Sequence, residues 1–120
     1  MEDPFRFVDE LRPLKLVHIW HPTVELKAVV AVDNIACGPA VSRVRMAPDV
    51  STEEAFRLAR AVTLKNAAAG LPHGGGKSVI FADPKMPERA KARFRRSLAL
   101  CERQAGDRET VSSIDSLNTN

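Results

Sequence analysis

The sequence predicts an α/β fold. Two runs of β-branched and apolar residues are followed by a helical pattern, then by a short apolar run and a second helical pattern. This order of strand, strand, helix, strand and helix is typical of α/β domains. The length of 120 residues, with 44% hydrophobic and 28% charged residues, indicates one globular domain with a modest core.

The first two predicted strands are Lys15 to Trp20 and Glu25 to Val32. The short segment 21–23 between them contains a proline, as expected for two strands joined by a tight connection. After the second strand we predict a loop, marked by Gly38, Pro39 and Pro48.

The first helix is predicted from near Thr52 to Ala69. Ser51 stands three residues before Glu54, the spacing at which a hydroxyl and a carboxylate can each accept a backbone N–H at the start of a helix. Gly70 follows the last helical position and is a typical C-terminal stop.

The remaining elements are a short strand from Ser78 to Phe81 and a basic helix from Pro87 to about Gln104. We assign residues 1–105 to one domain. Residues 106–120 show no period of two or of 3.6, so we predict a poorly ordered tail there.

Composition argues against several classes of partner. The net charge is +3, but the basic residues concentrate in the second helix, so we expect no nucleic-acid partner. The sequence has no run of about 18 apolar residues, so we expect no membrane span. Cys37 and Cys101 lack the spacing of a metal site, which favours free thiols in a reducing cytoplasm and no metal.

Lys65 is the first candidate site residue. Steps of four, three and four place it on one helical stripe with Leu58, Val62 and Ala69, so its ammonium group projects from an apolar face. It also lies near the helix end, where a lysine complements the helix dipole and extends to water. The sequence leaves both interpretations open.

The segment Gly74-Gly75-Gly76-Lys77 is predicted to connect the first helix to the third strand. Three glycines permit close backbone approach to a ligand, although glycines also mark ordinary turns. A P-loop is excluded, because its pattern requires a glycine where Leu71 stands and a strand before the helix. A desolvated lysine beside a second cation can act as a base, so Lys65 and Lys77 form a candidate pair.

The segment from Thr63 to Lys77, TLKNAAAGLPHGGGK, resembles the core motif of the Glu/Leu/Phe/Val dehydrogenases, a family of amino-acid dehydrogenases. Asp33-Asn34, Cys37 to Ala40 and Arg45-Met46 resemble the loop before the same helix. The resemblance covers about Leu26 to Pro84. It implies a small mixed β-sheet flanked by helices, as in the N-terminal domain of those enzymes.

The resemblance also implies roles for individual residues. Lys77 corresponds to the catalytic lysine that activates water, and Lys65 to the lysine that holds the substrate carboxylate or that water. The backbone of Gly74 and Gly75 corresponds to the lining of the amino-acid site. Asp115 stands at about the separation from Lys77 expected of the family's catalytic aspartate.

Two positions bear on substrate choice. Val41 resembles the aliphatic residue of leucine-type members, which favours an apolar amino acid. Ser42 and Arg43 replace the paired glycines of the family, so bulk and charge enter where the family has only backbone. Arg43 could therefore block the pocket.

The function implied is the substrate-side and dimerisation domain of an NAD(P)-dependent amino-acid dehydrogenase, which converts an L-amino acid to a 2-oxo acid. No G-x-G-x-x-G turn is present, so we expect a truncated member without a Rossmann domain, which binds no cofactor and is inactive alone. We expect an amino acid as ligand and a homo-oligomer formed through this domain. A non-catalytic self-association module and the remnant of a disrupted gene stay open as alternatives.

Overall fold

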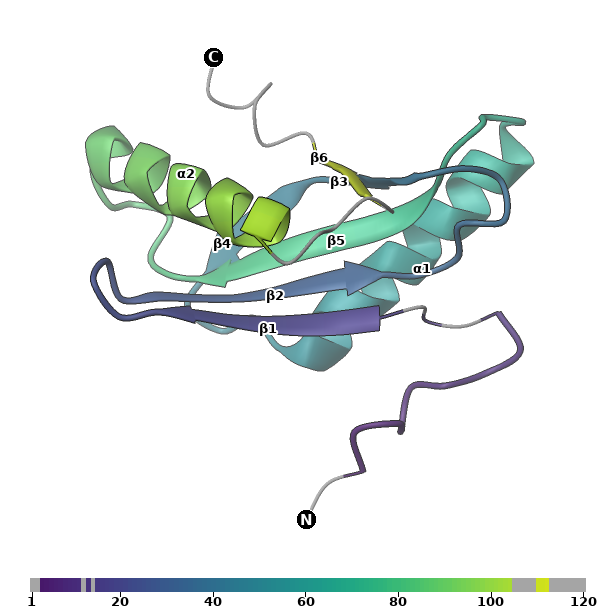
Figure 1. Ribbon diagram of the computed structural model, residues 1–120, viewed down its shortest axis with the longest axis horizontal. Coiled ribbons are helices and arrows are strands. Elements are labelled where there is room, and N and C mark those ends of the chain that lie inside the picture. Colours follow the sequence, from purple (N-terminus) through teal and green to yellow (C-terminus); the bar gives the residue numbers. More distant parts are fainter. Residues whose placement is uncertain (1–2, 12, 14, 105–109, 113–120) are drawn as a thin grey trace.

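The computed structural model describes residues 3–11, 13, 15–104 and 110–112. Figure 1 shows two helices packed against one sheet. In chain order the elements are β1 (Lys15–His21), β2 (Leu26–Val32), β3 (Ala40–Ser42), β4 (Val44–Ala47), α1 (Thr52–Ala68), β5 (Gly74–Phe81), α2 (Glu88–Gln104) and β6 (Thr110–Ser112).

The six strands form one mixed sheet in the order β1-β2-β5-β3-β6, and β4 also pairs with β5. The β1–β2 and β2–β5 pairs are antiparallel, whereas β3 and β4 both run parallel to β5. Ala40 lies opposite Gly74 and Val44 opposite Ser78, so β3 and β4 share one register and are two parts of an interrupted strand. The small mixed sheet flanked by helices is confirmed.

The two helices cover opposite faces of the sheet. The central strand β2 is therefore buried on both sides. Val29 and Ala31 pack in one cluster with residues of α1, and Val30 and Val32 pack in another with Leu98 of α2. This alternation follows from the two-residue period of a strand, and a continuous apolar run is expected where both faces are covered. β5 lies beside β2 and contributes to both clusters.

Most element boundaries agree with the sequence. The ends of β1, β2, α1 and α2 differ by at most one residue from those predicted. The Ser51 hydroxyl accepts the Glu54 amide at 3.1 Å and so caps α1, while the Glu54 carboxylate forms an ion pair with Arg45. Gly70 has a positive φ of 69°, as expected of a helix stop.

The prediction that Gly74 to Lys77 form a connecting loop was wrong, because β5 already begins at Gly74. Gly76 and Lys77 pair with β2, and Gly74 and Gly75 pair with β3. A Cβ at Gly75 would overlap the Ala59 carbonyl oxygen and the Thr63 hydroxyl of α1. The glycines therefore permit close approach of a helix to the strand, which is a recognised reason for glycine inside a strand.

Two short strands fall inside the region predicted as a loop. β3 and β4 contain three and four residues, too few for an alternating pattern to be recognised, and they form by pairing with β5 more than 30 positions away. Within the predicted tail, residues 110–112 form β6 against β3. The other residues of that tail lie outside the part of the chain that the structure describes. Neither described helix has the length and apolar character needed to cross a bilayer.

We predict that Gly75→Ala destabilises the fold by about 1–3 kcal/mol, because the added methyl group meets α1 backbone that cannot move independently. Gly70→Asn is the matched control, since no atom lies within 4 Å of a Cβ there and asparagine tolerates positive φ. Thermal unfolding of the two variants is the measurement. Equal melting temperatures for the two would contradict the proposed contact.

Candidate functional site

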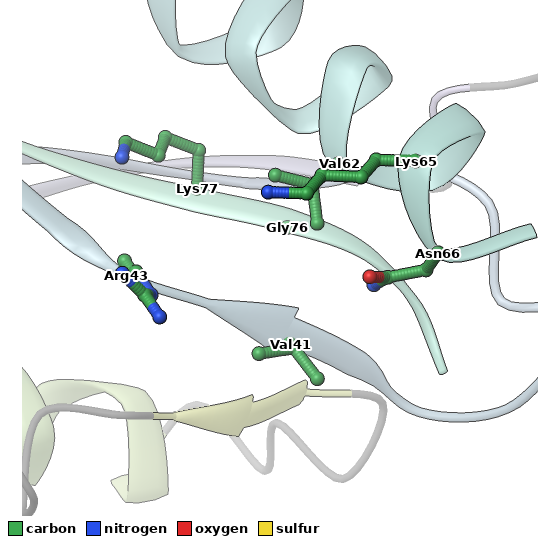
Figure 2. A pocket seen from close by; sticks show the side chains of 7 residues that line it. All are labelled: Val41, Arg43, Val62, Lys65, Asn66, Gly76 and Lys77. Atoms are coloured by element: carbon green, nitrogen blue, oxygen red, sulfur yellow. The ribbon is translucent and has the colours of Figure 1, made fainter. Parts of the chain in front are cut away.

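A cavity of about 240 Å³ lies between α1, β5 and the break between β3 and β4. Four residues singled out from the sequence, Val41, Arg43, Lys65 and Lys77, meet in it (Figure 2). The described residues that line it are Val41, Arg43, Val62, Lys65, Asn66, Gly76 and Lys77.

Helix and strand geometry explain why these side chains converge. Lys65 and Asn66 follow Val62 by three and four positions, so all three lie on one face of α1. Lys77 lies two positions after Gly75 and therefore on the same face of β5, the face that contacts α1. In Figure 2 the Lys65 side chain extends from α1 along β5 in the direction of Lys77. Lys65 is exposed in the last turn of α1, so it also complements the helix dipole.

Lys77 is electrostatically unusual. Burial lowers the pKa of its ammonium group, and the positive charges of Arg45 and Arg43 lower it further, while Glu54 acts in the opposite direction. The two arginines, and not Lys65, are the cations that add to the effect of burial. A lysine with a lowered pKa is neutral, and so able to accept a proton, at lower pH than an ordinary lysine.

The lining of the cavity is cationic. Among the described residues, the lining includes Arg43, Lys65 and Lys77 and no carboxylate. A concave site lined by one sign of charge concentrates ligands of the opposite sign. The arrangement is therefore suited to a small anion, because the volume is below the roughly 300–1,000 Å³ typical of pockets for drug-sized ligands.

The two glycines predicted to line the site lie beside the cavity. Gly74 donates its amide to the Pro39 carbonyl at 3.0 Å, and Gly75 donates to the Asn34 carbonyl at 3.3 Å. The glycine in the lining is Gly76, the next in the run. Asp115, predicted as a catalytic aspartate, lies outside the described residues.

Asn66 is a lining residue that sequence reasoning did not single out. Its side-chain amide donates to the Gly74 carbonyl oxygen at 2.9 Å, which ties the end of α1 to the start of β5. The asparagine directly after Lys65 was visible in the sequence, but its partner lies across the turn and no local pattern indicates it.

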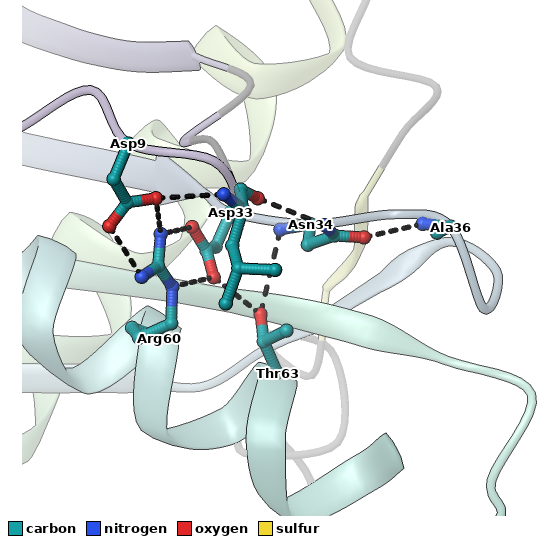
Figure 3. A network of polar contacts seen from close by, with 7 residues as sticks. Asp9, Asp33, Asn34, Ala36, Arg60 and Thr63 are labelled. Carbon is teal, nitrogen blue, oxygen red and sulfur yellow. Dashed lines mark hydrogen bonds and ion pairs between the residues drawn. The ribbon is translucent and has the colours of Figure 1, made fainter.

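A partly buried ion-pair network holds α1 at its position (Figure 3). Arg60 Nε donates to Asp33 at 2.8 Å, and Arg60 Nη1 donates to Asp9 at 2.7 Å. The Thr63 hydroxyl donates to the same Asp33 carboxylate at 2.7 Å. Hydrogen bonds to Asp9 and then to Asp33 raise the pKa of Arg60, so its charge is permanent. The network joins the end of β2 to α1 one helical turn from the cavity residues.

The network fixes the two elements, α1 and β5, that carry the lysines of the cavity. Thr63 lies against Gly75 of β5 and two positions before Lys65. Asp33, fully buried, also fixes β5 through its own amide, which donates to the Gly75 carbonyl at 2.8 Å. The carboxylate of Asp33 thus fixes the helix and its backbone fixes the strand that carries Lys77.

The described residues do not fit a dinucleotide site. Such a site requires a glycine-rich turn whose free amides and helix N-terminus face the pyrophosphate. Here the glycine run lies inside β5, between β2 and β3, and the amides of Gly74 and Gly75 are already bonded. In the same part of the chain no group of three or more His, Cys, Asp or Glu residues is arranged to hold a metal ion.

Comparison with known proteins gives consistent matches. The family model described as Glu/Leu/Phe/Val dehydrogenase, dimerisation domain, matches residues 21–118. Phenylalanine dehydrogenase of Thermoactinomyces intermedius is 39% identical over 89 residues, which is 71% of this chain and 24% of that protein. Valine dehydrogenase of Streptomyces coelicolor is 50% identical over 64 residues, which is 50% of this chain and 18% of that protein.

Solved structures of amino-acid dehydrogenases also align with this chain. L-tryptophan dehydrogenase from Nostoc punctiforme aligns with a TM-score of 0.63 and 35% identity over 78% of this chain and 31% of that chain. Hetero-hexameric glutamate dehydrogenase from Thermus thermophilus aligns with a TM-score of 0.67 and 29% identity over 75% of this chain and 24% of that chain. The chain spans a third or less of the length of each of these four proteins.

We predict that Arg60→Ala lowers the free energy of unfolding by about 3–5 kcal/mol, because it leaves the buried Asp33 carboxylate without its cation. Arg57→Ala is the matched control on the same helix, since Arg57 is 73% exposed and forms an i,i+4 pair with Glu53. Its effect should stay below about 0.5 kcal/mol. Urea unfolding of both variants is the measurement, and similar losses would refute a special role for the network.

Proposed function

The chain belongs to the Glu/Leu/Phe/Val dehydrogenase family, and on this premise we propose that its cavity is the amino-acid site of an NAD(P)-dependent amino-acid dehydrogenase. The observation that carries the proposal is the meeting of Lys65, Lys77 and Val41 in one cationic cavity. The reaction proposed is the reversible oxidative deamination of an L-amino acid to a 2-oxo acid.

In this proposal the two lysines have different tasks. Lys65, an exposed cation at the end of α1, holds the α-carboxylate of the substrate. Lys77, half-buried with a lowered pKa, accepts a proton from the water that attacks the α-carbon. Hydride transfer belongs to a nicotinamide held by another part of the enzyme, so no step of it is assigned to the described residues.

The lining favours an amino acid with an aliphatic stem. Val41 and Val62 supply apolar surface next to the cations, and the small volume limits the length of the side chain. Cys37 and Cys101 are both free, which supports a reducing compartment, and we propose the cytoplasm.

Self-association is a second proposed function, favoured by the edge of the sheet. β1 ends the strand order on one side, so among the described strands its outer edge has no partner. Trp20 on β1 is 56% exposed, which is unusual for a tryptophan on a monomer surface. The family model is itself described as a dimerisation domain. We propose a homo-oligomer that joins two copies along β1.

We predict that Lys65→Gln and Lys77→Gln each weaken binding of 4-methyl-2-oxopentanoate by about tenfold, because Lys65→Gln removes a charge-assisted hydrogen bond to the carboxylate and Lys77→Gln removes a positive charge that attracts the anion while the amine is protonated. The control is Lys85→Gln, an exposed lysine outside the lining. Isothermal titration calorimetry at low salt is the measurement. Affinity should fall as the pH rises through the lowered pKa of Lys77, because the neutral amine no longer attracts the anion.

The Lys77→Gln variant is expected to lose this pH dependence, whereas Lys65→Gln keeps it. If neither lysine variant differs from Lys85→Gln, the cavity is not a carboxylate site and the proposed function is wrong.

We predict that Trp20→Lys weakens self-association at least about tenfold, because a charge replaces apolar surface at the contact. Leu64→Lys is the matched control, since Leu64 is 55% exposed on α1, away from β1. Sedimentation velocity over a range of concentrations is the measurement. A wild-type chain that stays monomeric throughout would rule out the proposal.

A further inference from the structure

Lys77 faces the cavity from a fixed place on β5. Its backbone pairs with the apolar Ala31 of β2, and the next residue, Ser78, donates its amide to the Arg43 carbonyl oxygen at 3.0 Å. The side chain is half-buried and lines the cavity, in which Lys65 extends along β5 towards it (Figure 2). Burial disfavours the ammonium form of a lysine and favours the neutral amine, which is the nucleophilic form.

The charges around Lys77 include one carboxylate. Glu54 of α1 acts on the Lys77 ammonium group, and its carboxylate also forms an ion pair with Arg45 at 2.9 Å. Arg43 and Lys65 line the cavity beside Lys77. With Glu54 counted, the described surroundings of Lys77 hold three cations and one anion, so their net charge is positive.

These surroundings favour a negatively charged group on the Lys77 side chain. The pKa of its ammonium group is lowered by burial first and then by Arg45 and Arg43, so the positive form is disfavoured. A modification that turns the amine into an anion reverses the sign of these charge interactions. The cations that oppose the ammonium form would then hold the product by charge-assisted hydrogen bonds.

Carbon dioxide makes this conversion without a catalyst. The lone pair of Nζ attacks the carbon atom, an N–C bond forms, a C–O π pair moves to oxygen, and the nitrogen releases a proton to water. The product is a carbamate, R–NH–COO⁻, and nothing is oxidised or reduced. Carbon dioxide is small and uncharged, so it can pass the apolar surface of Val41 and Val62. The volume of about 240 Å³ has room for the added carboxylate, since a water molecule takes up only about 30 Å³.

We propose that Lys77 is a carbamate-forming site, at which its side-chain amine reversibly adds carbon dioxide and Arg43 and Lys65 hold the resulting carbamate. The inference goes beyond the proposed function, because it requires the cations of the cavity and no amino acid. Its consequence is a carboxylate of the protein itself inside the cavity.

The test traps the carbamate on the full chain. The protein is equilibrated with isotopically labelled bicarbonate at mildly alkaline pH, treated with triethyloxonium ion to esterify the carbamate, and digested for mass spectrometry. Lys85 is the internal control, since it is exposed and lies outside the lining. We expect at least about tenfold more labelled ester at Lys77 than at Lys85, a ratio that corresponds to one pKa unit of differential stabilisation.

A second reagent separates a held carbamate from an amine that is merely reactive. Acetic anhydride gives a neutral product, so the acetylation rate reports the nucleophilicity of Lys77 alone. Lys65→Gln should lower the trapped carbamate by about tenfold, because a charge-assisted hydrogen bond is lost, and should lower the acetylation rate far less. Arg43→Gln should lower both, and the carbamate more, since Arg43 also lowers the pKa of Lys77. Arg43→Lys keeps the charge and should retain most of both.

Arg57→Gln is the matched control. It removes a positive charge from an exposed position on α1 outside the cavity, so its carbamate yield at Lys77 should equal that of the wild type. The thermal unfolding midpoint of each variant verifies folding. The comparison of Arg43→Gln with Arg57→Gln decides the question if Lys65→Gln does not fold.

Three results would overturn the inference. Equal trapping at Lys77 and Lys85 would show that no carbamate is stabilised. Equal losses of carbamate and of acetylation in the cavity variants would show a reactive amine only. A loss in Arg57→Gln as large as in Arg43→Gln would show general electrostatic attraction. Binding of a 2-oxo acid is measured separately, so a failure of this inference and a failure of the proposed function are distinguishable.

Discussion

The close contact between α1 and β5 at Gly75 is the constraint on which the site depends. A side chain at that position would overlap the Ala59 carbonyl oxygen and the Thr63 hydroxyl, so the helix can approach the strand only because glycine stands there. Asp33 holds the same contact from the end of β2, since its carboxylate binds Arg60 and Thr63 while its amide binds the Gly75 carbonyl. The position of α1 along β5 is therefore fixed by backbone and by buried charge together. A shift of the helix would separate the lysines.

The chemistry of the cavity follows from this contact and from the break in the neighbouring strand. α1 contributes Lys65 beside Val62, β5 contributes Lys77, and the break between β3 and β4 contributes Arg43. Lys77 is half-buried near two guanidinium groups, and its pKa is lowered by that burial first and by the charges second. A structural device that stabilises the fold thus also produces a lysine suited to proton transfer, and a cationic surface suited to carboxylates.

How much the sequence could predict depended on whether the determining contact is local. The limits of α1 follow from Ser51 and Gly70, whose effects are confined to neighbouring residues of the chain. These limits were predicted within one residue. The features that depend on contacts between distant parts of the sequence were not predicted. The glycine run resembles a turn locally, but its partners lie on β2, β3 and α1. Asp33 and Arg60 are 27 positions apart, and no pattern in the sequence links them. Lys65 and Lys77 were a candidate pair from their positions in the sequence, whereas their separate roles came from a family resemblance, and Asp115 lies beyond the described residues.

The most direct test of whether the cavity between α1 and β5 is an amino-acid site is a crystal structure of the chain soaked with a 2-oxo acid. The close α1–β5 contact predicts that the ligand's carboxylate lies within hydrogen-bond distance of Lys65, with its 2-oxo group next to Lys77 and its stem against Val41. Ligand density outside the cavity, or inside it but contacting neither lysine, would contradict the account.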